Sequence, residues 1–180
     1  MDAATECIIL VDNSNVWIEG MKYAAHTKGM PNQPDGKPPQ DWSWRVDFGS
    51  LLKEVQNGHR LVRAILVGST PPPNDSVWNA AAAQGFKVIT HERSSAGEKA
   101  VDTEVVAQGL KAIYKHPRPA ILKLLSGDRD FVPLIQAAYE EGWETELWSF
   151  SSGMSVELAQ MANRVITLET VFDKIGNSQV

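Results

Sequence analysis

Runs of apolar residues alternate along the chain with segments that have helical periodicity. Six runs, the last of them weaker, predict strands at Cys7–Val11, Leu61–Val67, Phe86–Thr90, Ala120–Leu125, Glu144–Phe150 and Arg164–Leu168. The segments between them predict helices at Asn15–Lys28, Val46–Asn57, Asp75–Gln84, Val101–His116, Phe131–Glu141 and Ser152–Asn163. Strands that alternate with helices indicate a mostly parallel sheet covered on both faces. The sequence therefore predicts an α/β fold, a three-layer Rossmann-like sandwich around a central sheet of five to six strands.

Two segments fall outside this alternation. Residues 29–44 hold four prolines and predict a surface insertion within a single domain that spans residues 1–180. Trp42 and Trp44 close this insertion, and two interpretations of them stay open: they fasten the loop to the body, or they offer aromatic faces on which RNA bases stack. Residues 174–180 predict a frayed tail.

Composition narrows the class of protein. The chain has 180 residues, 43% of them hydrophobic, and no apolar run approaches the length of a membrane span or a signal peptide. We therefore expect a cytoplasmic protein that does not enter a membrane. The net charge of -5 argues against a strong, salt-sensitive nucleic-acid binder. It leaves open a catalytic encounter with RNA, because acids that surround metal ions count in this formal total.

Acidic residues stand where predicted strands end and helices begin. Asp12 follows the first strand, Asp128 and Asp130 follow the fourth, and Asp102 opens the helix after the third. With the common strand order 3-2-1-4-5, these residues would meet at the carboxyl edge of the sheet, where ligands bind in such folds. The alternative is that each acid caps its own turn or helix.

A cluster of four carboxylates predicts a cation. Two carboxylates about 4 Å apart repel each other by about 4 kcal/mol at an effective dielectric constant near 20. Oxygen ligands without nearby histidine or cysteine spacing suit Mg²⁺ or Mn²⁺. Such ions activate water and stabilise the leaving oxygen of a phosphodiester, so hydrolysis of phosphodiester bonds is the matching reaction.

Three segments resemble a known family: VDNSN (residues 11–15), EKAVDTEVV (residues 98–106) and LSGDRDFVPLI (residues 125–135). Together they resemble the NYN domains, ribonuclease-like members of the PIN-like superfamily. The resemblance implies a metal-dependent ribonuclease, expected to be an endonuclease, that hydrolyses single-stranded RNA with a metal-activated water. It also implies a homodimer as one form of assembly. The catalytic and metal-binding residues would be Asp12, Asp102, Asp128 and Asp130.

Further residues are candidates for supporting roles. Asn15 would orient Asp12 or a water, or cap its own helix, and Ser126 and Thr103 would support the acids or bond to nearby backbone. The candidates for RNA contact are Lys99, Arg93, Trp42 and Trp44. The competing hypothesis is a non-catalytic RNA-binding module that acts with a partner. A phosphatase of the Asp-x-Asp type is disfavoured, because Ser14 occupies the position of its second aspartate.

Overall fold

A computed structural model describes residues 5–70, 76–92 and 97–179 of the chain, without the side chains of residues 97 and 98. Within these ranges six strands form one sheet in the order β4-β3-β1-β5-β6-β7, and all neighbours run parallel. They are β1 (Glu6–Asp12), β3 (Arg60–Thr70), β4 (Lys87–Glu92), β5 (Ile121–Leu125), β6 (Glu144–Ser149) and β7 (Arg164–Thr167). The predicted strand order and the Rossmann-like α/β fold are confirmed.

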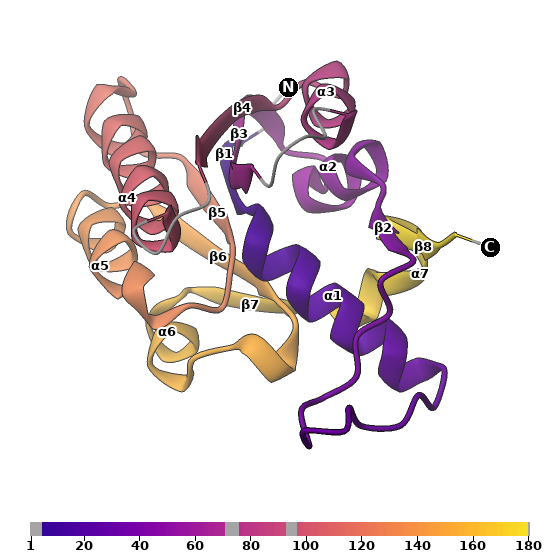
Figure 1. Ribbon diagram of the computed structural model, residues 1–180. Coiled ribbons are helices and arrows are strands. Elements are labelled where there is room, and N and C mark those ends of the chain that lie inside the picture. Colours follow the sequence, from indigo (N-terminus) through magenta and orange to yellow (C-terminus); the bar gives the residue numbers. More distant parts are fainter. Residues whose placement is uncertain (1–4, 71–75, 93–96, 180) are drawn as a thin grey trace.

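Helices cover both faces of this sheet (Figure 1). One face carries α4 (Gly97–Lys115), α5 (Val132–Glu140) and α6 (Val156–Met161), and the other carries α1 (Asn13–Thr27), α2 (Phe48–Gln56), α3 (Ser76–Ala83) and α7 (Phe172–Ile175). Strand β1 shows why both faces need cover, since all seven of its residues are buried. Ile8 and Leu10 pack under α4 and α5, whereas Ile9 and Val11 pack under α1 and α2.

The helix expected at Ser152–Asn163 is interrupted. A 3₁₀ turn, η2 (Ser151–Gly153), comes first, Met154 and Ser155 are extended, and α6 begins only at Val156. The Ser155 hydroxyl caps the new helix by accepting a hydrogen bond from the Leu158 N–H at 3.4 Å. Sequence periodicity alone missed this break, because Met154, Leu158 and Met161 keep helical spacing across it.

The prediction of a frayed tail is wrong. Residues Gly176–Ser178 form a short strand, β8, which pairs antiparallel with β2 (Trp44–Val46). The pairing is fastened by Trp44, whose indole is only 1% exposed and stacks on Phe172 at a centroid distance of 5.6 Å. This contact joins residues far apart in the sequence, so the polar residues of the tail alone do not predict a strand.

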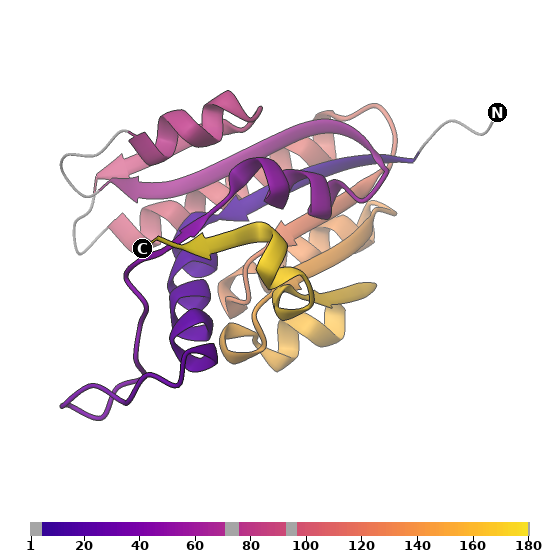
Figure 2. The ribbon, with the colours of Figure 1, turned by 90° about the vertical axis from the view of Figure 1, so that its right-hand side faces the viewer.

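The proline-rich insertion leaves the body as an exposed arm between α1 and β2 (Figure 2). Its base is held by Asp41, a buried residue that accepts hydrogen bonds from the Lys28 ammonium and the Ser178 hydroxyl, each at 2.6 Å. Burial alone would raise the pKa of Asp41, but these donors and Ser43 hold that pKa well below its ordinary value. The arm is therefore anchored to both α1 and β8. In the described part of the chain, no helix combines the length and the apolar character needed to cross a membrane.

Candidate functional site

The candidate site lies at the carboxyl edge of the sheet, where β1 and β5 end side by side. Val11 pairs with Leu125, so Asp12 and Ser126 follow on neighbouring strands. Strand order reverses at this point, because the chain continues from β1 to β3 on one side and reaches β5 and β6 on the other. Open α/β sheets bind their ligands at such a crevice.

Asp12 is the most deeply buried acid of this edge, with 4% of its surface exposed. One carboxylate oxygen accepts a hydrogen bond from the Asn15 N–H at 3.3 Å, which caps α1, and the other accepts one from the Ser126 hydroxyl at 3.0 Å. Burial, together with the smaller effect of the negative charge of Asp128, raises the pKa of Asp12 to about 6, although hydrogen bonds from Asn15, Ser126 and Ser14 act in the opposite direction. The ionised form of Asp12 therefore gains from a cation placed beside it.

Ser126 joins Asp12 to the second acid. Its side chain is fully buried, donates to Asp12, and accepts a hydrogen bond from the Asp128 N–H at 3.2 Å. Asp128 in turn accepts from the Asp130 N–H at 2.9 Å and caps the 3₁₀ turn η1 (Arg129–Phe131). The Asp128 side chain is half-buried, and that of Asp130 is exposed. The Ser126 hydroxyl thus bonds to the side chain of Asp12 and to the backbone of Asp128.

Gly127 is clamped between α1 and the segment after η2. Its N–H donates to the Asn15 side-chain oxygen at 3.2 Å, and its carbonyl accepts from the Ser155 N–H at 2.8 Å. A Cβ atom at this position would lie 2.0 Å from the Gly153 carbonyl oxygen, so only glycine fits. The Asn15 side-chain oxygen therefore binds the backbone of Gly127. It positions the loop that carries Asp128.

Glu19 is a component of this region that the sequence did not reveal. It lies four positions after Asn15, on the same side of α1, and only 8% of it is exposed. Its carboxylate accepts hydrogen bonds from the Ser152 hydroxyl and the Lys22 ammonium, both at 2.7 Å, and its side chain packs against Gly153. The spacing from Asn15 is visible in the sequence, but the partner in η2 is not.

Asp102 reaches the same edge from α4. Gly109, two helical turns later on the same side of the helix, packs against Leu134 of α5 and Leu10 of β1. Asp102 therefore lies on the side of α4 that faces α5 and η1, and it is half-buried. No three His, Cys, Asp or Glu side chains of the described residues are arranged to hold one metal ion. The structure brings Asp12 and Asp128 together, and it places Asp102 and Asp130 on the elements around them without a common coordination sphere.

The remaining predicted residues have different surroundings. The Thr103 hydroxyl donates to the Lys99 carbonyl at 2.7 Å within its own helix, which is the backbone role considered for it. The Lys99 side chain is exposed, and Arg93 lies outside the described residues. Trp44 is buried and stacked on Phe172, so the expectation that it contacts RNA is wrong: the ring has no free face.

Trp42, unlike Trp44, has an exposed ring. It is 64% exposed, and it meets Trp17 of α1 edge-to-face, with the ring centroids 6.2 Å apart. The Arg45 guanidinium donates to the Trp42 carbonyl at 2.6 Å and steadies the backbone there. Trp17 follows Asp12 by five residues, about 7 Å along a helix axis. The exposed indole is therefore held near the start of α1.

Comparisons with known proteins agree with this architecture. The family model of the NYN domain matches residues 9–169. The chain belongs to the NYN domain family. This NYN domain is therefore of the PIN-like, nuclease-type class. The crystal structure of a protein of unknown function from Vibrio parahaemolyticus is similar to it, with a TM-score of 0.72 and 15% sequence identity over 98% of this chain and 99% of that chain. That likeness shows the fold, and no curated protein matches the chain.

The donor set of the site fits a hard divalent cation. Asp12 and Asp128 supply carboxylate oxygens, and the raised pKa of Asp12 is what burial and a neighbouring acid produce when no cation offsets their charge. Mg²⁺ and Mn²⁺ prefer such oxygen ligands and retain several waters, so they do not require a complete cage of protein groups.

Proposed function

We propose that this NYN domain is a divalent-metal-dependent ribonuclease that hydrolyses phosphodiester bonds of single-stranded RNA. The observation that carries the proposal is the Asp12–Ser126–Asp128 connection at the switch point of a nuclease-type fold. The buried Ser126 hydroxyl bonds both to the Asp12 carboxylate and to the backbone N–H of Asp128, and it thereby holds Asp12 next to the loop that carries Asp128.

In this proposal the four acids form one metal-binding set, and other residues hold them in place. Asp12 and Asp128 would hold Mg²⁺ or Mn²⁺, with Asp102 and Asp130 approaching from α4 and η1 to complete the set. The bound metal would supply an activated water and stabilise the leaving oxygen. Ser126 and Asn15 hold Asp12 and the Asp128 loop in place. Thr103 supports α4 through its own backbone.

Recognition of RNA would use the exposed groups near this edge. Trp42 offers a free indole face for a base, and the cation of Lys99 lies in the first turn of α4, three residues before Asp102. Arg93 is proposed for phosphate contact on its position in the sequence. We also propose endonucleolytic cleavage, a cytoplasmic location and a homodimer. The dimer is tested by light scattering and the mode of cleavage by the product ladder.

The test is cleavage of an end-labelled single-stranded RNA in Mn²⁺, Mg²⁺ or EDTA. The parent protein is compared with Asp128→Asn and with the matched control Asp173→Asn, an exposed acid on α7. We expect the parent and the control to cleave only with metal, and Asp128→Asn to lose at least a hundredfold in rate. Equal cleavage by Asp128→Asn and the parent would contradict the assignment. Tight RNA binding by a folded parent that never forms product would instead favour the non-catalytic RNA-binding module.

A further inference from the structure

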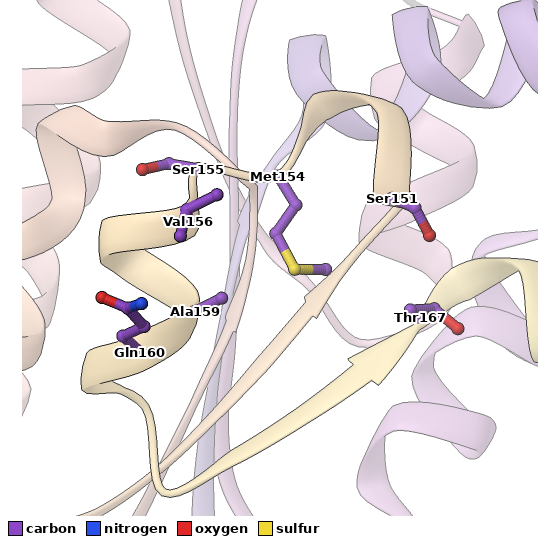
Figure 3. Close-up of a pocket in the computed structure, with 7 residues that line it drawn as sticks. All are labelled: Ser151, Met154, Ser155, Val156, Ala159, Gln160 and Thr167. Carbon is purple, nitrogen blue, oxygen red and sulfur yellow. The ribbon is translucent and has the colours of Figure 1, made fainter.

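A hollow of about 330 Å³ lies between η2, α6 and the end of β7. Its apolar lining comes from Met154, Val156 and Ala159 (Figure 3). Figure 3 shows Met154 extending between α6 and β7, with Ser151 and Thr167 on the far side. Met154 and Ser155, which line this space, lie in the break between η2 and α6.

The lining combines apolar surface with neutral hydrogen-bonding groups. Among the described residues, the Ser151 and Thr167 side-chain hydroxyls have no protein partner for a hydrogen bond, and no charged side chain lines the hollow. Such a lining suits a flat neutral ring with polar edges and does not suit a phosphate. A nucleobase has this character, since its faces are apolar and its edges carry donors and acceptors.

The hollow is joined directly to the loop of the acids. Ser155, which lines it, donates its N–H to the carbonyl of Gly127, the residue before Asp128. Arg129, the residue after Asp128, connects this loop to α6, because its side chain, which is 76% exposed, pairs with Glu157 at 2.8 Å. An exposed ion pair of this kind contributes little stability, so its guanidinium is free to exchange Glu157 for a phosphate.

We propose that the hollow is a nucleobase subsite of the RNA strand that the acids engage. The strand would run from Asp128 past Arg129, which meets a phosphate, and would seat one base against Met154 and Ala159. Ser151 and Thr167 would bond to the edge of that base. This inference rests on the proposed function for its substrate class, and it adds where the strand lies and how the domain discriminates bases.

The test measures binding of fluorescein-labelled A8, C8 and U8 RNA by anisotropy in EDTA, so that turnover does not enter the readout. Ala159→Leu fills the hollow, and Thr167→Val removes one hydroxyl at nearly constant shape. Their matched controls are Ala82→Leu on the exposed side of α3 and Thr27→Val at the far end of α1. Arg129→Gln removes the proposed phosphate contact.

We expect Ala159→Leu to weaken binding about tenfold, in line with the loss of one stacked base. Thr167→Val should change the affinities for A8, C8 and U8 unequally, whereas Arg129→Gln should weaken all three alike and reduce the salt dependence. Binding of Ala159→Leu within twofold of Ala82→Leu would overturn the subsite, as would a parent protein that binds no octamer. A change of oligomeric state in Ala159→Leu, with RNA binding intact, would show that the hollow receives a second copy of the chain and would also overturn it.

Cleavage by the parent in Mn²⁺, measured in parallel, separates the subsite from the proposed function. Cleavage together with unchanged binding by Ala159→Leu leaves the nuclease and removes the subsite. Weakened binding by Ala159→Leu without any cleavage by the parent keeps the subsite, in a domain that binds RNA and does not cut it.

Discussion

The side-chain oxygen of Asn15 accepts a hydrogen bond from the Gly127 N–H at 3.2 Å, across 112 residues of sequence. Through this bond the first turn of α1 holds the loop that carries Asp128, and Ser155 holds the same loop from the other side. The position of the acid thus depends on Asn15 and Ser155, neither of which carries a carboxylate.

Gly127→Ala should disrupt the site. The new Cβ would meet the Gly153 carbonyl oxygen at 2.0 Å, and neither backbone can yield without moving the Asp128 loop. We expect a loss of about 1–3 kcal/mol in the free energy of unfolding and a large fall in metal-dependent cleavage. Gly49→Ala is the control, since the nearest atom there is the end of the flexible Gln84 side chain. Parent-like cleavage by Gly127→Ala would show that the loop position does not matter.

Asp12→Asn should make the metal-free protein more stable at neutral pH. The pKa of Asp12 is about 6 when folded, above the ordinary 3.8, so the folded state favours the protonated acid. Its ionisation therefore costs stability as pH rises from about 4 to about 6, by up to about 3 kcal/mol. In urea unfolding measured in EDTA, the free energy of unfolding of the variant should rise relative to that of the parent as the pH increases across this range.

The effect of Mn²⁺ on thermal stability is a second test of the role of Asp12. Mn²⁺ at pH 7 should raise the melting temperature of the parent and leave that of Asp12→Asn nearly unchanged. A parent and a variant with the same pH dependence and the same response to Mn²⁺ would speak against an ionisable, metal-facing Asp12.

Asp41→Asn should destabilise the protein at neutral pH by about 1–3 kcal/mol, because the charge-assisted hydrogen bonds that the buried carboxylate accepts from Lys28, Ser43 and Ser178 would be weakened or lost. The folded pKa of Asp41 lies below its unfolded value, so its contribution is present above about pH 4 and disappears as the pH falls through the folded pKa. The difference in stability between parent and variant should therefore shrink below pH 4. Asp35→Asn, on the exposed part of the arm, is the comparison. A constant difference at every pH would contradict the assigned charge.

Trp42→Ala and Trp44→Ala should separate binding from packing. Trp42→Ala should weaken binding of single-stranded RNA about tenfold with little change in melting temperature, since the exposed ring is the proposed stacking surface. Trp44→Ala should lower the free energy of unfolding by about 3–5 kcal/mol, because it empties the space beside Phe172 and Gly20. Anisotropy and thermal unfolding of both variants give the comparison, and equal effects on RNA binding would remove Trp42 from the proposed surface.

The sheet was predictable because its signals are local. Each parallel strand is a short apolar run between turn residues. Asp12, Asp128 and Asp130 follow such runs, and Asp102 lies near the start of the helix after one. Strand order then placed Asp12 beside the residues after Leu125. For Ser126 the sequence left two roles open, support of the acids or a bond to nearby backbone, and the structure shows its hydroxyl bonded to Asp12 and to the Asp128 N–H.

What the sequence missed depends on contacts between distant segments. The tail residues become a strand only because β2 offers a free edge and Trp44 packs on Phe172. Glu19 lies beside the site because Ser152, 133 residues later, donates to it. The break before α6 arises where Gly153 packs against Glu19, and no periodicity reports such a contact. Such contacts between distant segments decide which carboxylates lie near one another, and the composition of the chain does not report them.

The most direct test of the metal-dependent nuclease measures Mn²⁺ binding by calorimetry and single-turnover RNA cleavage on the same samples of parent, Asp12→Asn and Asp128→Asn. We expect the parent to bind Mn²⁺ and cleave, and both variants to fold but to lose Mn²⁺ affinity and cleavage together. Cleavage that survives in either variant, or that persists in EDTA, would contradict a metal-dependent nuclease built on these two aspartates.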